Sequence, residues 1–362
     1  MTDPAPERTA RGNDRPIGRR TFLAAAAGAA GVSLAGCQQT EVSTGNPDVI
    51  EDRPSKVYVP THTDEMHHVE TVAVGRLRFA FSFSRPHRFW LVTGSRVRRV
   101  SVAEDDAMHL MVSVWDAETG TVLPASSASV TIARDGEAVV EKSLWSMLSQ
   151  TMGVHFGDNV ALDGDGTYEV TVDYGPIDSD LAGGLADLDP GPHEVAVDLE
   201  YGESAVADLG FEDLGYRAGR EDAVEPMDMG MIQVGQLPTA DALPGEVLGA
   251  ATTGGARLVG TVLAAPPAGI EGDGQYLAVS PRTPYNRFPL PFAALSAATG
   301  GDGQVLLPAI DSELGFHYGR ILAEDPGGAV EVTVDAPPQL ARHEGYETAF
   351  VDMPAVTLGG ED

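Results

Sequence analysis

Two segments of the chain carry histidine and methionine at spacings that suit metal binding. In His109-Leu110-Met111 the imidazole and the thioether are two residues apart, so a strand would place both on one face. His155 stands between Gly153 and Gly157, and we expect an irregular segment there that presents the imidazole at a fixed angle. Imidazole with thioether suits Cu(I), whereas imidazole with carboxylate and water accepts iron, zinc or Cu(II).

The segment around His155 belongs to an internal repeat. Residues 148–173 and 310–335 align without gaps and are identical at 11 of 26 positions, one of which pairs His155 with His317. The two copies lie 162 residues apart, so the repeating units are whole folding units and not turns of a solenoid.

The two copies differ where chemistry could occur. The second copy has Tyr276 and Ala278 in the positions of His109 and Met111, yet it keeps its own histidine. A histidine that persists without partners also fits a structural role, in which His155 bonds a turn. A metal site at His109, Met111 and His155 and a set of structural histidines are therefore both open.

Short runs in which apolar and polar residues alternate predict strands from about residue 66 onward. They lie at 77–83, 97–102, 109–115, 128–133, 168–173 and 194–200 in the first copy. The fold class predicted is all-β, with two tandem immunoglobulin-like antiparallel β-sandwiches after a signal peptide and a flexible tether. In the second sandwich we expect a strand pair formed by 275–280 and 329–335.

The composition of successive segments predicts five parts. They are a signal at 1–36, a flexible tether at 37–64, a first sandwich with the metal site at 65–215, a linker at 216–226 and a second, diverged sandwich at 227–358.

The first 37 residues have the pattern of an export signal. Arg19-Arg20 precedes an apolar, alanine-rich run that ends at Cys37, which resembles a twin-arginine leader with a lipoprotein cleavage box. We expect a lipid on Cys37 that holds the protein in the bilayer, on the extracytoplasmic face of the cell membrane. An uncleaved anchor is the alternative, and it gives the same location.

The net charge of the chain limits the classes of partner that the protein can bind. With 23 basic and 54 acidic residues the net charge is −31, which excludes a surface for nucleic acid because such surfaces need clustered lysine and arginine. Acids spread along the whole chain resemble the proteins of salt-loving archaea. Cys37 is the only cysteine, so any metal must be held by histidine, methionine or carboxylate.

The order of the motifs resembles a known family. His109-Leu110 opens a strand, Gly153-Val154-His155-Phe156-Gly157-Asp158-Asn159 follows, and Gly166 begins a Gly-x-Tyr-x-Val-Thr run. Over about 72–176 this series resembles the periplasmic iron-transport protein family, which includes a treponemal metal-binding lipoprotein and proteobacterial iron-uptake proteins. The resemblance implies an immunoglobulin-like sandwich, a copper, iron or zinc site and a role beside an iron permease.

The resemblance assigns the family's strand histidine to His109 and its loop histidine to His155. Met111 stands where the family has glutamate, and Met147 lies one place from the family's methionine, which aligns with Leu148. For the family's remaining histidine, His87 and His193 are the candidates.

Other patterns carry weaker expectations. Met66, His67 and His68, with His62 nearby, could trap a metal at the surface or could be solvated. Met227, Met229 and Met231 could bind Cu(I) or face a core. The run Asp163-Gly164-Asp165-Gly166 predicts a hairpin turn.

We expect a lipid-anchored protein that binds iron or copper outside the cell and assists iron uptake beside an iron permease. The sequence leaves open whether the protein forms a homodimer. Zinc is a further candidate. The alternative is a metal-free, immunoglobulin-like lipoprotein of the cell surface with a structural or partner-binding role. The chain has no nucleophile elbow, phosphate loop or zinc-protease helix, so we do not expect an enzyme.

Overall fold

A computed structural model describes residues 47–124, 127–228, 230–323 and 326–360 of the protein. The predicted signal, Cys37, the first part of the tether and Met229 lie outside the described residues. None of the helices in the described ranges is long and apolar enough to cross a membrane.

In the described residues, the first half of the chain forms β1 to β13, one 3-10 helix (η1) and one short α-helix (α1). The bounds are β1 His62–Asp64, β2 Met66–Val74, β3 Leu77–Ser84, β4 Phe89–Thr93, β5 Arg96–Val100, β6 Asp106–Asp116, β7 Ala128–Arg134, β8 Glu137–Ser149, β9 Gly153–Ala161, β10 Gly166–Tyr174, β11 Asp180–Ala182, η1 Gly183–Leu185, β12 His193–Tyr201, α1 Glu203–Ala207 and β13 Phe211–Asp213.

The second half forms the remaining elements. The bounds are η2 Ala240–Ala242, β14 Glu246–Thr253, β15 Ala256–Leu263, β16 Gln275–Arg282, β17 Ala294–Ala298, β18 Gln304–Asp311, β19 Gly315–Leu322, β20 Ala329–Ala336, β21 Ala341–Arg342 and β22 Val356–Gly359. The described part of the chain is therefore all-β, as the sequence predicts at this level.

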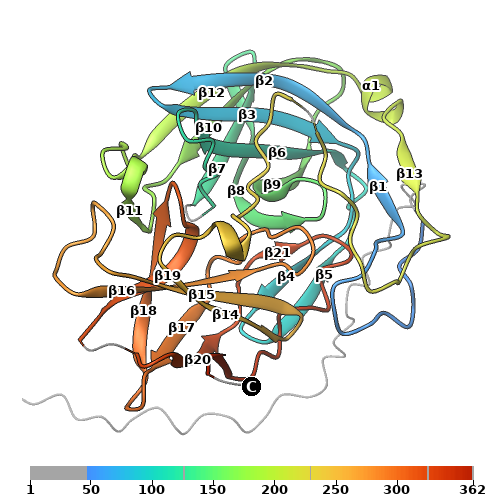
Figure 1. Cartoon of the computed structure of the whole chain (residues 1–362). Coiled ribbons are helices and arrows are strands. Elements are labelled where there is room, and N and C mark those ends of the chain that lie inside the picture. Colours follow the sequence, from blue (N-terminus) through green and yellow to red (C-terminus); the bar gives the residue numbers. More distant parts are fainter. Residues whose placement is uncertain (1–46, 125–126, 229, 324–325, 361–362) are drawn as a thin grey trace, which may run out of the picture. The chain divides into compact units, whose positions relative to one another are not determined.

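Two sheets carry the fold (Figure 1). The first has the order β12-β10-β7-β8-β9-β6-β3-β2, and its end strands β12 and β2 approach one another, so it is nearly closed. The long strand β8 joins its two parts, because its first residues pair with β7 and its last pair with β9. The second sheet has the order β14-β15-β16-β19-β18-β17-β20-β22, and β14 approaches β22 in the same way.

Each half of the chain also contributes a short strand to the sheet of the other half. β11 pairs in parallel with β18 of the second sheet. β21 pairs with β4 and with the end of β8 in the first sheet. Residues from 47 onward accordingly belong to one compact unit.

Alternation along the strands explains why the sheets form. In β3 the side chains of Phe79, Phe81 and Phe83 point into one buried core, and those of β10 and β12 alternate between buried valines and exposed acids. The opposite face of β3 and β6 is also covered, because Ser82, Ser84 and His109 are buried there. This second buried face carries the candidate site.

The structure corrects three local predictions. His155 lies within the regular strand β9 and not in an irregular segment, because only Gly153 at its start has a positive φ, of 68°. The segments at 275–280 and 329–335 are strands, but β16 pairs with β15 and β19 whereas β20 pairs with β17 and β22. The turn at 163–166 connects β9 to β10, which do not pair, so it is not a hairpin.

The last part of the predicted tether packs on the protein. Val57, Tyr58 and Val59 are each at most 2% exposed, and His62 begins β1, which pairs with β13. Val57 packs in the main core and Val59 packs against Leu214 and Val224, and these contacts hold the segment in place. The other boundaries between the predicted parts stay predictions.

Candidate metal centre

Two side chains of the centre project from the covered face of the first sheet. His109 lies on β6 and His155 on β9, two strands that are paired, and Met147 of β8 lies directly opposite His155. All three residues are at most 2% exposed. Because His155 and Gly157 are two residues apart, they share the face that His109 also occupies.

Two further histidines come from segments that lie over this face. His87 lies in the connection between β3 and β4. His343 follows β21, and its backbone N–H donates to the carbonyl oxygen of Leu148 at the end of β8 (3.0 Å). The short strand β21 therefore sets the position of His343 beside β8.

The four imidazoles form one cluster. One ring nitrogen from each of His87, His109 and His343 lies within 4.8 Å of the others. The ring centroids of His87 and His109 are 4.0 Å apart, and those of His155 and His343 are 5.3 Å apart. Three of the histidines thus present ring nitrogens to one point, and His155 joins them through its contact with His343.

The hydrogen bonds of the cluster fix which nitrogen carries the proton. Nδ1 of His109 donates to the side-chain oxygen of Asn159 (2.8 Å). Nδ1 of His155 donates to the carbonyl oxygen of Gly153 (3.2 Å), and Nδ1 of His87 donates to that of Arg85 (3.2 Å). Such donation leaves the lone pair on Nε2, as in metal-binding histidines. Among the described residues, none offers a hydrogen bond to the buried Nε2 atoms of these three histidines or of His343.

Burial keeps the cluster neutral. It lowers the pKa of His87 and of His155 to about 4, with the hydrogen bonds from Nδ1 opposing the shift. Burial, together with the neighbouring histidines, holds the pKa of His109 and of His343 well below the usual value. At neutral pH the four rings are therefore bases with free lone pairs.

The absence of a side chain at Gly157 leaves space for two possible metal ligands, Nε2 of His109 and the sulfur of Met147. A Cβ atom at this position would lie 2.9 Å from Nε2 of His109 and 3.2 Å from the sulfur of Met147. The thioether beside the cluster is therefore that of Met147. Met111 lies on the same face of β6 and is buried, but its cross-strand neighbour is Gly157 and its sulfur is not among the atoms nearest that position.

An ion pair links the two segments that lie over the sheet. Arg88, next to His87, donates to Glu344, next to His343, at 2.8 Å, and both side chains are at most 10% exposed. Arg342 donates to the carbonyl oxygens of Pro338, Tyr346, Ala349 and Phe350 and so connects the segments before and after β21. These contacts hold His87 and His343 at a fixed separation.

Asn159 connects the sheet to the loop that covers it. Its oxygen accepts from Nδ1 of His109, and its amide donates to the carbonyl oxygen of His87 (3.0 Å). We expect Asn159→Ala to weaken metal binding by about tenfold to a hundredfold, the usual effect of losing a partner of a ligand. Titration with copper measures the affinity.

Asn159→Asp is the matched variant for this prediction. It keeps an oxygen that accepts from His109 but loses the donor to His87, so its affinity should lie between those of the wild type and of Asn159→Ala. Equal affinities in all three folded proteins would show that Asn159 does not position the ligands.

The second repeat contains a closed version of the same arrangement. His317 lies on β19 and its Nδ1 donates to the carbonyl oxygen of Gly315 (2.9 Å), as His155 does to Gly153. Here, however, the hydroxyl of Tyr276 lies 3.0 Å from Nε2 of His317 and fills the space beside Gly319. A hydrogen bond thus satisfies Nε2 of the histidine in the second copy, whereas no described residue bonds Nε2 of His155 in the first.

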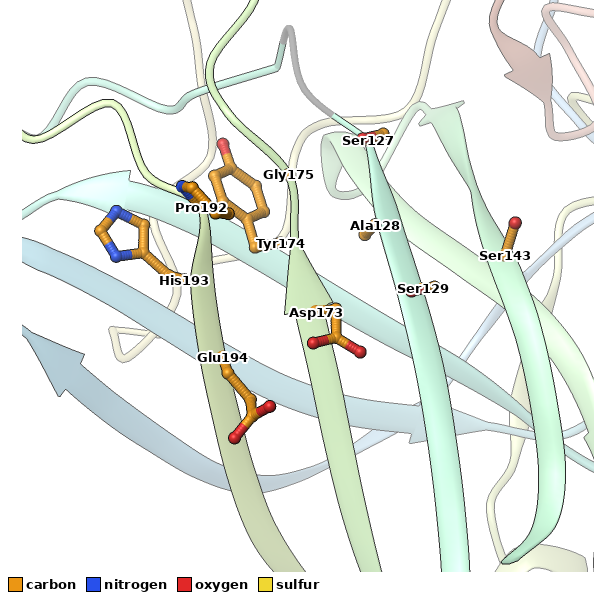
Figure 2. A pocket seen from close by; sticks show the side chains of 10 residues that line it. All are labelled: Ser127, Ala128, Ser129, Ser143, Asp173, Tyr174, Gly175, Pro192, His193 and Glu194. Carbon is orange, nitrogen blue, oxygen red and sulfur yellow. The ribbon is translucent and has the colours of Figure 1, made fainter.

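The remaining candidates lie elsewhere. His193 is on β12, where its ring stacks on that of Tyr174, and both residues line the pocket of Figure 2. Met66, His67 and His68 are on β2, where the ring of His67 packs on Phe83 and Nε2 of His68 bonds the hydroxyl of Thr71 (2.8 Å). Neither group contacts the four-histidine cluster.

His343 is the residue that sequence reasoning missed. It lies 188 positions after His155, and no neighbouring motif marks it as a ligand. The only available signal was that it is one of nine histidines in the chain.

Comparison with known proteins assigns the chain to a family. A family model described as "Domain of unknown function (DUF7350)" matches residues 88–178 and 241–359, more than half of the chain. The chain belongs to this family. The matched ranges contain His109, His155 and His343, and His87 immediately precedes them. No curated protein matches the chain.

Three solved structures of bacterial proteins are similar to part of the chain. FetP of uropathogenic Escherichia coli strain F11, as isolated after expression in the periplasm, is 19% identical over 38% of this chain and 97% of its own, with a TM-score of 0.29. A copper-bound variant of FetP is 20% identical with the same coverage and TM-score. The copper-reconstituted P19 protein of Campylobacter jejuni is 17% identical over 38% and 96%, with a TM-score of 0.28.

Proposed function

We propose that the protein binds one copper ion through the Nε2 atoms of His87, His109, His155 and His343. The observation that supports this most directly is that ring nitrogens of His87, His109 and His343 lie within 4.8 Å of one another, that the ring of His155 lies 5.3 Å from that of His343, and that no described residue bonds the Nε2 atoms of these four histidines. Leaving a buried polar atom without a partner costs about 1–3 kcal/mol. A cation among the four lone pairs offsets that cost for all of them.

The second repeat supports this interpretation as an internal comparison. Where Tyr276 occupies the position of His109, its hydroxyl bonds Nε2 of His317 and no free lone pair remains. If the repeated histidine had only a structural role, one tyrosine would therefore be enough to bond its Nε2 atom. The first repeat instead has three further histidines and the sulfur of Met147 near the same position.

The donor set favours copper among the candidate metals. Imidazole nitrogens bind copper and zinc, and copper is the tighter-binding of the two in a given nitrogen site. A neighbouring thioether adds affinity for Cu(I) and little for zinc or iron. Iron prefers some oxygen ligands, and the cluster of ring nitrogens includes no carboxylate.

The proposal extends to where the protein works. The twin-arginine and Cys37 pattern supports a lipid-anchored protein on the extracytoplasmic face of the membrane, and the motif series over 72–176 supports a role in iron uptake beside a permease. The competing function is a metal-free cell-surface module. The persistence of His317 in a copy without metal donors is the observation that favours it.

Elemental analysis and titration with copper test the proposal. The wild type should bind one copper ion per chain, and His109→Ala and His155→Ala should each weaken binding by more than a hundredfold. His193→Ala is the matched control, because it removes a histidine of the same half that lies outside the cluster, and it should bind as the wild type does. A folded wild-type protein that takes up neither copper nor zinc contradicts the proposal.

A further inference from the structure

Arg282, the last residue of β16, places a buried positive charge in the second sheet. The residue is 2% exposed. Its Nη1 atom donates to the carbonyl oxygen of Pro238, but among the described residues none accepts a hydrogen bond from Nε or Nη2. A buried charge is costly unless it is paired and hydrogen-bonded. Two unbonded donors on one buried guanidinium therefore indicate a ligand of opposite charge.

The two unbonded donors lie on the edge of the guanidinium that binds two oxygens at once. Nε and Nη2 are the atoms through which Arg76 binds both carboxylate oxygens of Asp116, at 2.8 Å each. Such a pair of parallel donors matches the spacing of two oxygens in a carboxylate or a phosphate. The unbonded edge of Arg282 is therefore suited to an oxyanion.

Two further arginines add positive charge beside Arg282. Arg257 is its cross-strand neighbour on β15, which lies beside β16 in Figure 1, so the two side chains share one face of the sheet. Nε of Arg287 donates to the carbonyl oxygen of Leu237 (2.9 Å), next to the carbonyl of Pro238 that Arg282 binds. Burial, together with the charges of Arg287 and Arg257, lowers the pKa of Arg282 to about 10, so the side chain stays charged at neutral pH.

No carboxylate balances these three arginines, although the protein is strongly acidic. Arg76 and Arg88 each pair with a carboxylate, whereas no carboxylate in the described ranges forms an ion pair with Arg257, Arg282 or Arg287. With 54 acidic residues in the chain, carboxylates are the commonest charged groups. An anion from solution can supply the charge that the protein itself does not supply here.

The first repeat indicates that the fold does not require a charge at this position. Trp115 aligns with Arg282, and the two residues form matching β-bridges, to Val122 and to Pro289. Trp115 packs with Val122 in a small apolar cluster. Because an apolar side chain completes this position in one copy, the buried arginine of the other copy needs a separate reason, and binding of an anion provides one.

We propose that Arg282, with Arg257 and Arg287, binds one tetrahedral oxyanion of the phosphate or sulfate type. Nε and Nη2 of Arg282 bind two of its oxygens, and the remaining oxygens interact with the other two arginines. A dianion is attracted to three positive charges more strongly than a singly charged carboxylate is. The ion enters from the solvent side, where Arg257 is exposed. This inference is independent of the copper site, because it concerns β15, β16 and the segment after β16.

Isothermal titration calorimetry of the full chain with sodium phosphate tests the site, with the ionic strength held constant by sodium chloride. The wild type should bind one phosphate ion per chain. Arg282→Met should abolish binding, and Arg257→Gln should weaken it about tenfold, the usual effect of losing one hydrogen bond to a charged group. Sulfate should bind as phosphate does, and acetate should bind at least tenfold more weakly. Arg98→Gln, at an exposed position of β5, is the matched control and should bind phosphate as the wild type does.

The outcomes separate this proposal from the proposed function. Arg282→Met should keep the circular dichroism spectrum and the copper affinity of the wild type, and Arg257→Gln remains decisive if Arg282→Met does not fold. A wild type that binds neither phosphate nor sulfate overturns the oxyanion site, as does unchanged phosphate binding in the folded variants. Acetate that binds as tightly as phosphate overturns the assignment to a tetrahedral ion. Loss of copper binding in the wild type overturns the proposed function alone.

Discussion

Copper should raise the unfolding temperature of the wild-type protein by about 6 °C, and His343→Ala should abolish this rise. A ligand at about a thousand times its dissociation constant stabilises the folded state by about 4 kcal/mol, which corresponds to about 6 °C at an unfolding entropy of about 2 cal/mol/K per residue over residues 47–360. His343 supplies one of the four Nε2 atoms from a segment at the far end of the chain. Differential scanning calorimetry with and without copper measures both shifts.

The comparison in metal-free protein makes this prediction specific. Without copper, His343→Ala removes a buried lone pair that has no partner, so the unfolding temperature should stay within a few degrees of the wild type. His193→Ala should keep the full rise on addition of copper. If His343→Ala also keeps the full rise, the segment after β21 does not contribute a ligand.

The metal-free protein should lose stability as the pH falls from about 6.5 to about 4. Burial lowers the pKa of His62, His87 and His155 to about 4 in the folded state. Between these pH values the unfolded chain binds more protons at these positions, so their contribution to stability is complete above pH 6.5 and decreases towards pH 4. Each fully buried histidine should account for about 3 kcal/mol across this window, at about 1.4 kcal/mol per pKa unit.

Some carboxyl groups act in the opposite direction. Burial raises the pKa of Asp106, Asp158 and Glu347, so the folded protein takes up protons there more readily and gains stability on acidification. His155→Met isolates the histidine effect, because it removes one titrating ring and leaves these carboxyl groups in place. Urea titrations of both proteins at pH 7 and pH 4 should show a smaller loss for the variant, and equal losses would contradict the assignment.

Local sequence patterns predicted the parts of the site that depend on local structure. Alternation placed His109 on a strand with its side chain on a defined face, and the repeated Gly-x-His-x-Gly segment identified His155. The structure brings both into one cluster with His87. The predicted irregular segment around His155 was wrong because glycine was taken as a sign of a turn, whereas Gly157 lies in the strand to leave space for Met147 and His109.

The rest of the site depends on contacts that no local pattern records. The choice between Met147 and Met111 follows from the register of β8 against β9, which places Met147 opposite His155. His343 reaches the cluster because β21 pairs with β4 and β8, far from β21 in the sequence. A two-residue strand has too few side chains to show a period.

The exchange of β11 and β21 between the sheets makes the structures of the two repeats depend on one another. A polypeptide that ended at residue 226 would lack His343, and it would leave β8 and β4 without the backbone of Ala341 and Arg342. A polypeptide that began there would lose β11 from the side of β18. Removing either half would therefore damage the sheet of the other. The duplication that supplied a second sheet thus also became a condition for the complete set of four imidazoles.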